Sequence, residues 1–211
     1  MTPVVEKVVP PTAKNGTNGA NGHPPKPQSR EELIYALMRT DGKAEIIRGK
    51  IVQFMTSGDM PSSAVGNVVF ALRLWTRDTG ATGRVYADGI GNLCDLPHRF
   101  SFSPDASYYT GERSGAKFLP TPPVFAVEVR SEGDYGPAME IEMRDKRADY
   151  FATGFTEVVW DVDLLSTGDV VRKYTKAGGA QTPVAVYKRG DIADAEPAVP
   201  GFSMPVDDLF E

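Results

Sequence analysis

The chain has 211 residues, 41% of them hydrophobic, and a net charge of -5 at pH 7. This is enough for one hydrophobic core, and the acidic balance excludes a general basic coat, so any nucleic-acid binding would use a local patch or an oligomeric arrangement. The single cysteine, Cys94, excludes an internal disulfide and fits a reducing cytosol, so we expect a cytoplasmic protein. With only two histidines, a Cys/His zinc site is disfavoured, as are most Ser-His or Cys-His nucleophiles. Any metal would therefore be a hard cation bound by oxygen.

The N-terminal stretch differs in composition from the rest of the chain. Residues 1–28 are rich in Pro, Gly, Asn and Lys and show no periodicity, which predicts a disordered tail. They lack the apolar segment of a signal peptide, and the chain has no apolar run long enough to span a membrane. We therefore expect one folded domain over residues 29–211 and no membrane partner.

The first half of this domain begins with a helix, because Ser29 and Glu32 form a capping box that predicts a helix to about Arg39. Two strands joined by a tight turn are then expected over 44–47 and 50–55. Helical spacing of apolar residues predicts the main core helix from about Asp59 to a cap at Gly80. Three strands follow, over 83–87, 91–96 and 100–109.

The second half is organised around the stretch PPVFAVEVRS, which ends at Ser131 and predicts a strand buried on both faces. A helix is expected over 138–153, and strands over 157–162, 169–174 and 184–187. The C-terminal segment, with Phe202 and Leu209, is expected to dock on the core. This order predicts an α/β (α+β) domain with one mixed sheet flanked by helices.

Glu128 is a lone acid in that apolar strand. An ionised carboxylate is costly to bury unless something pairs with it. Glu128 could form a buried salt bridge or bind a divalent metal. We favour the metal ligand, because a divalent cation is the strongest partner for a buried carboxylate.

Four side chains could form one site with this acid: Glu45, Asp105, Glu128 and Lys146. Asp105 enters a strand after Pro104, and neighbouring strands lie about 4.8 Å apart, so Asp105 and Glu128 could share one cation. Lys146 lies on the following helix and is long enough to reach them. A metal that neutralises charge, with a lysine that orients water, is what phosphodiester hydrolysis requires.

Arg130 shares a strand face with Glu128. An arginine remains protonated and cannot act as a base, but it can bind phosphate through its guanidinium fork. Arg130 either contacts phosphate or neutralises Glu128.

These motifs resemble the Uma family of predicted restriction endonucleases, in the PD-(D/E)XK nuclease superfamily. The matching residues, which run in the family's order from about Ser29 to the C-terminus, are the hairpin at Glu45, Pro104-Asp105, Glu128 to Ser131, Lys146 and Tyr150, Gly154-Phe155, Trp160, and Pro200-Gly201-Phe202.

The resemblance implies a restriction-endonuclease-like core and a nuclease dependent on Mg²⁺ or Mn²⁺, acting on nucleic acid and most naturally on DNA. Asp105 and Glu128 would be metal ligands, with the backbone carbonyl of Val129 as a third and Glu45 as an accessory acid. Lys146 would be the superfamily lysine, moved onto a helix. Two positions depart from the family pattern: Ser62-Ser63-Ala64 replaces a histidine, and Arg130 stands where an apolar residue is usual.

Two functions outside catalysis fit the same residues. One is a binding module that keeps the fold without activity, which the acidic net charge and Arg130 favour. The other is a structural or oligomerising protein whose acids are held in salt bridges, and a homodimer could form by pairing short strands between protomers.

Overall fold

The computed structural model describes residues 29–211, so the predicted tail over 1–28 lies outside the described residues. The elements in chain order are α1 (Arg30–Leu37), β1 (Ala44–Ile47), β2 (Lys50–Gln53), α2 (Asp59–Thr79), β3 (Arg84–Ala87), β4 (Asn92–Leu96), β5 (Arg99–Phe102), β6 (Ala106–Tyr109), β7 (Phe125–Val129), α3 (Pro137–Ala152), β8 (Val158–Val162), β9 (Val171–Thr175), β10 (Ala185–Tyr187), β11 (Ile192–Asp194), β12 (Ser203–Pro205) and the 3₁₀ helix η1 (Val206–Phe210).

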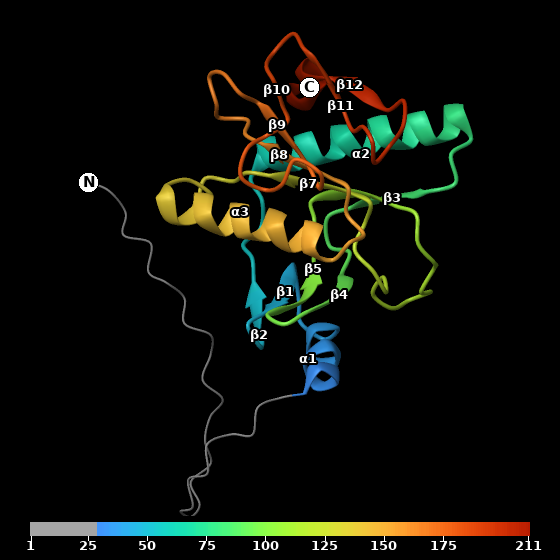
Figure 1. The fold of residues 1–211 in the computed structure, drawn as a ribbon, viewed down its shortest axis with the longest axis vertical. Coiled ribbons are helices and arrows are strands. Elements are labelled where there is room, and N and C mark those ends of the chain that lie inside the picture. The colour runs from blue at the N-terminus through green and yellow to red at the C-terminus, as the bar shows by residue number, and fades with distance from the viewer. Residues whose placement is uncertain (1–28) are drawn as a thin grey trace, which may run out of the picture.

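The strands form three sheets. The central one is mixed and has six strands in the order β10-β9-β8-β7-β6-β3, with β7 and β8 parallel and the other neighbours antiparallel. An antiparallel sheet of four strands, β2-β1-β5-β4, lies beyond α3, and β11 pairs with β12 near the C-terminus (Figure 1). The expected mixed sheet is thus present, and the early strands form a second sheet beside it.

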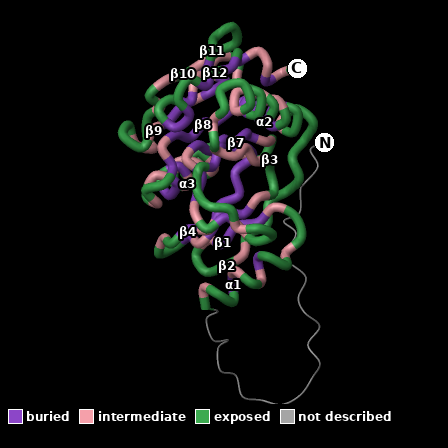
Figure 2. The backbone as a smooth tube through the Cα atoms, turned by 90° about the vertical axis from the view of Figure 1, so that its right-hand side faces the viewer, coloured by how far each residue is buried: buried purple, intermediate pink, exposed green. Residues whose placement is uncertain are grey.

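Alternate residues of β7 and β8 face different helices. Val127 and Trp160 pack in the main core with Val68 and Leu72 of α2, whereas Ala126 packs with Tyr150 of α3. The two helices therefore cover opposite faces of the central sheet, which confirms the prediction of a sheet flanked by helices and the α/β fold class. In Figure 2 the buried backbone runs through the middle of the molecule, and the loops at its margins are exposed.

The local signals for the helices are confirmed. Ser29 accepts from the Glu32 N–H and Glu32 accepts from the Ser29 N–H, which is the predicted capping box. Gly80 ends α2 with a φ of 70°, a left-handed conformation that glycine adopts without a Cβ clash. The C-terminal segment also docks as expected, since Phe202 and Leu209 are buried in the main core.

The prediction of one strand over 100–109 is wrong. This segment forms two strands, β5 and β6, because the chain leaves the four-stranded sheet after Phe102 and enters the six-stranded sheet at Ala106. Pro104 lies at the break, and proline cannot donate to a sheet ladder. The crossing from Ser103 to Asp105 places Asp105 at the seam between the two sheets.

Candidate active site

Four acids lie side by side across the central sheet. Glu128 of β7 is in register with Asp161 of β8. Asp105 immediately precedes Ala106, which pairs with both Val127 and Ala87, so Asp105 lies beside Glu128 on one side and Asp88 on the other. Like charges on adjacent strands destabilise a sheet unless cations separate them. We call Asp88, Asp105, Glu128 and Asp161 the acidic row.

Asp105 is fixed by backbone hydrogen bonds to the neighbouring strand. Its N–H donates to the carbonyl of Val127 at 3.0 Å, and its Oδ2 accepts from the N–H of Val129 at 2.6 Å. The structure therefore brings Asp105 beside Glu128, as the sequence predicted, and places the Val129 backbone against the Asp105 carboxylate.

Glu128 is held by two residues of α3. The ammonium of Lys146 lies 2.8 Å from Oε2, and the hydroxyl of Tyr150 donates to Oε1 at 2.7 Å. Lys146 and Tyr150 are four residues apart, which puts both on one face of the helix. Tyr150 is fully buried and stacks on Phe102 of β5, with the ring centroids 4.1 Å apart. Its hydrogen bond to Glu128 gives Tyr150 a positioning role.

Glu45 reaches the same lysine from the four-stranded sheet. Its Oε1 lies 3.0 Å from the Lys146 ammonium and accepts from the Ser103 N–H at 3.0 Å, while its Oε2 pairs with Arg99 of β5. Glu45 is completely buried. Lys146 thus joins carboxylates from two sheets, and the four side chains singled out in the sequence meet in one cluster.

The ionisation of this cluster follows from burial and charge. Burial, together with repulsion from Asp105, raises the pKa of Glu128 despite the nearby lysines. Burial alone would also raise the pKa of Glu45, but Lys146 and Arg99 outweigh it and hold that pKa below its ordinary value. The pKa of Lys146 is raised, since Glu128 and Glu45 outweigh the cost of burying its charge. Lys146 is therefore a permanent cation among acids.

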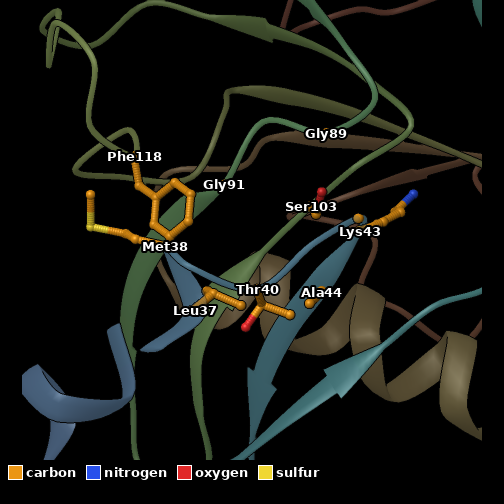
Figure 3. Close-up of a pocket in the computed structure, with 10 residues that line it drawn as sticks. Leu37, Met38, Thr40, Lys43, Ala44, Gly89, Gly91, Ser103 and Phe118 are labelled. Carbon is orange, nitrogen blue, oxygen red and sulfur yellow. The ribbon is translucent and has the colours of Figure 1, made fainter. Parts of the chain in front are cut away.

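Lys43 is a site residue that the sequence analysis missed. It immediately precedes β1, and its ammonium pairs with Oδ1 of Asp105 and lies 3.1 Å from Oδ1 of Asp88. Lys43 and Ser103 both border a small pocket next to the cluster, and the amine points away from the Phe118 and Met38 side of that pocket (Figure 3). The available signal was strand alternation, which puts positions 43 and 45 on the same face.

A second missed group connects the cluster to the surface. Arg99 bonds Asp149 of α3 through its Nε at 2.7 Å, and His98 lies 2.8 Å from the other oxygen of Asp149. The His98 side chain is about half exposed, whereas that of Arg99 is buried. These contacts connect Glu45 through Arg99 and Asp149 to His98 at the surface.

Arg130 lies on the α3 face, as alternation predicted, but its partners differ from those expected. Its guanidinium makes two bonds to Asp161, at 2.7 and 2.8 Å, and pairs with Glu140 of α3. Arg147 adds a third bond to Asp161 at 2.9 Å. Arg130 is buried and neutralises Asp161 rather than Glu128. Its donors face carboxylates, so its position gives no support to a phosphate contact.

The donor set of Asp105 and Glu128 fits a hard divalent cation. Over residues 29–211, no group of three Asp, Glu, His or Cys side chains converges as a preformed metal cage. Two adjacent carboxylates with a backbone carbonyl are nevertheless the kind of oxygen set that suits Mg²⁺, which retains several waters. In the structure each of the four carboxylate oxygens accepts from, or pairs with, a group of the protein itself.

Comparison with known proteins identifies the family of the chain. The model of the Uma2 family, described as "Putative restriction endonuclease", matches residues 30–207. The chain belongs to the Uma2 family. This confirms the resemblance found in the sequence, and the family description supports a nuclease with a nucleic-acid substrate.

A solved structure shows the same fold as this Uma2 protein. It is the crystal structure of a putative nuclease belonging to DUF820 from Anabaena variabilis ATCC 29413, with a TM-score of 0.63 and 15% sequence identity over 84% of this chain and 97% of that chain. No curated protein matches the chain. None of the helices in residues 29–211 has the length and apolar character needed to cross a membrane.

Proposed function

We propose that this Uma2 protein is a metal-dependent endonuclease that hydrolyses phosphodiester bonds of nucleic acid, with DNA as its substrate. The observation that carries the proposal is the meeting of Asp105, Glu128 and Lys146. They come from a strand crossing, a central strand and a helix. Asp105 accepts from the N–H of Val129, the residue next to Glu128, and Glu128 pairs with Lys146. Family membership supports the same reaction class.

Asp105 and Glu128 would hold the cation, Mg²⁺ or Mn²⁺, together with the carbonyl of Val129, and Glu45 would be the accessory acid. The cation, when bound, supplies Lewis-acid stabilisation of charge on the phosphoryl oxygens and a more acidic water.

The protein's own groups orient the site. Tyr150 fixes one oxygen of Glu128, and the Val129 N–H fixes one oxygen of Asp105. Lys146 remains charged between Glu128 and Glu45, where it can orient the attacking water or stabilise the charge that develops on the phosphate.

The test uses supercoiled plasmid with purified full-length protein and Mg²⁺ or Mn²⁺. Wild type should nick or linearise the plasmid, EDTA should stop it, and Asp105→Asn and Glu128→Gln should each lower the rate at least a hundredfold. Glu142→Gln on the exposed side of α3 is the matched control and should cleave normally. The proposal fails if wild type does not cleave, or if both carboxamide variants cleave as well as wild type.

A second candidate is an inactive module that keeps the nuclease fold for binding or oligomerisation. It is favoured by the complete pairing of the Asp105 and Glu128 oxygens within the protein. Calorimetry with Mn²⁺ separates the two: a nuclease site should bind metal and lose it in Glu128→Gln, whereas a structural network should bind none. Light scattering on the same samples tests whether the protein forms a homodimer.

A further inference from the structure

We propose that the Lys43 ammonium pairs with the Asp105 carboxylate when no metal is bound. When a divalent metal binds to Asp105, the ammonium leaves Asp105 and pairs with Asp88 alone. The inference rests on the proposed metal site and adds a positioning residue that acts through Asp105. It is carried by the place of Lys43 in the acidic row and by its two simultaneous ion pairs.

The first step is topological. The chain passes between the two sheets twice in this region, after β3 and before β6. Asp88 lies just after Ala87 and Asp105 just before Ala106, and these two alanines are paired. Both crossings therefore carry an aspartate at the same level, and Lys43 bridges the two carboxylates.

The second step is electrostatic. The Lys43 ammonium pairs with Oδ1 of Asp105, one of the two carboxylates proposed to hold the metal, and also stabilises the charge of neighbouring Glu128. A divalent cation near the same oxygen would be repelled by this ammonium. Mutual repulsion makes the two cations compete for Asp105.

The third step is that Asp88 provides Lys43 with a second ion-pair partner. Its ammonium already lies 3.1 Å from Asp88, so a movement of the side chain alone can transfer it. The Asp88 side chain is 41% exposed and that of Asp105 is 10% exposed, so an ammonium beside Asp88 is better hydrated. Metal binding would therefore move the lysine charge from the buried acid to the surface acid.

The experiment measures Mn²⁺ affinity by calorimetry on full-length wild type, Lys43→Gln and Asp88→Asn. Lys43→Gln should bind Mn²⁺ about tenfold more tightly, because one unit charge a few ångströms from the ion is removed. Asp88→Asn should bind about threefold more weakly, because an exposed ion-pair partner for the displaced lysine is lost. Lys50→Gln, at an exposed lysine of β2, makes the same change in net charge and should leave affinity unchanged.

The double variant separates a moving lysine from two fixed charges: the affinity lost on Asp88→Asn should be smaller in the Lys43→Gln background than in wild type, whereas fixed charges would give the same loss in both. Thermal melting without metal adds an independent readout: Lys43→Gln should melt lower than wild type and regain more stability on adding Mn²⁺. If wild type binds Mn²⁺ and Lys43→Gln binds it no more tightly, the inference is wrong and the proposed function stands. If Asp88→Asn keeps wild-type affinity, the role of Asp88 is wrong. If neither wild type nor Lys43→Gln binds Mn²⁺, the metal site itself is refuted.

Discussion

Lys146 and Glu128 form an ion pair of 2.8 Å between a helix and a central strand, and Lys146 also contacts Glu45 at 3.0 Å. The lysine is therefore held in place before any substrate arrives. Its long side chain is anchored at the charged end by acids from two different sheets.

The first prediction concerns this lysine. Lys146→Gln should lower plasmid cleavage by about a hundredfold or more, the usual effect of removing one preorganised donor from a transition state. Lys146→Arg keeps the charge and should retain the melting temperature better than Lys146→Gln. If it also cleaves at the wild-type rate, a cation of either shape is sufficient at this position. Wild-type cleavage by Lys146→Gln would contradict any catalytic role for the residue.

A second prediction distinguishes a structural ion pair of Arg130 with Asp161 from a phosphate contact. Arg130→Ala should lower the free energy of unfolding by about 3 kcal/mol, because it removes one partner of a buried ion pair and leaves Asp161 with Arg147 alone. Urea denaturation measures this change. Arg113→Ala, at an exposed arginine, should change stability by less than about 0.5 kcal/mol. A variant of Arg130 with normal stability and weakened DNA binding would instead indicate a phosphate contact.

The third prediction concerns pH. The pKa of Glu45 is lower in the folded protein than its ordinary value of about 4.5, so the folded state binds this proton less tightly than the unfolded chain does. Its contribution to stability is therefore fully present above that pH and is lost as the pH falls toward the lowered pKa. Wild type should lose stability more steeply than Glu45→Gln as the pH falls below about 4.5. Urea midpoints across this range test it, and equal slopes would contradict the assignment.

The same variant should also be less stable at neutral pH. Glu45→Gln leaves the buried charges of Arg99 and Lys146 with one partner fewer, which should cost about 3 kcal/mol. Glu31→Gln in the exposed first turn of α1 is the control and should behave as wild type.

The fourth prediction concerns two glycines with opposite surroundings. A Cβ at Gly83 would lie 2.1 Å from Cζ of Tyr108, whose hydroxyl accepts from the Gly83 N–H, so Gly83→Ala should cost about 1–3 kcal/mol. Gly66 lies in α2 with nothing near its Cβ position, so Gly66→Ala should stabilise the protein by about 0.5–1 kcal/mol. Thermal melts of the two variants should move in opposite directions.

The sequence allowed Asp105, Glu128 and Lys146 to be chosen as candidate site residues because each has a distinctive local context. Glu128 is an acid in an apolar strand, Asp105 follows a proline, and Lys146 lies four residues before Tyr150 on one helix face. Each of these is a local pattern, and the resemblance to a family supplied their combination.

The rest depended on contacts between distant segments. Arg99 and Asp149 are 50 residues apart, and Lys43 lies 62 residues from Asp105, so no local pattern joins them. The break between β5 and β6 was missed because apolar residues continue on both sides of Pro104, and only the proline marked the change of sheet.

The passage of the chain through Ser103 to Asp105 has a mechanical consequence. Asp105 lies two peptide bonds after Ser103, whose N–H donates to Glu45 of the four-stranded sheet, and the Asp105 side chain accepts from the Val129 N–H of β7. This short crossing is therefore held by both sheets, through Ser103 on one side and Asp105 on the other. Lys146 makes a similar connection from α3, since it contacts Glu45 of one sheet and Glu128 of the other, so the crossing and the helix both join the two sheets at the candidate site.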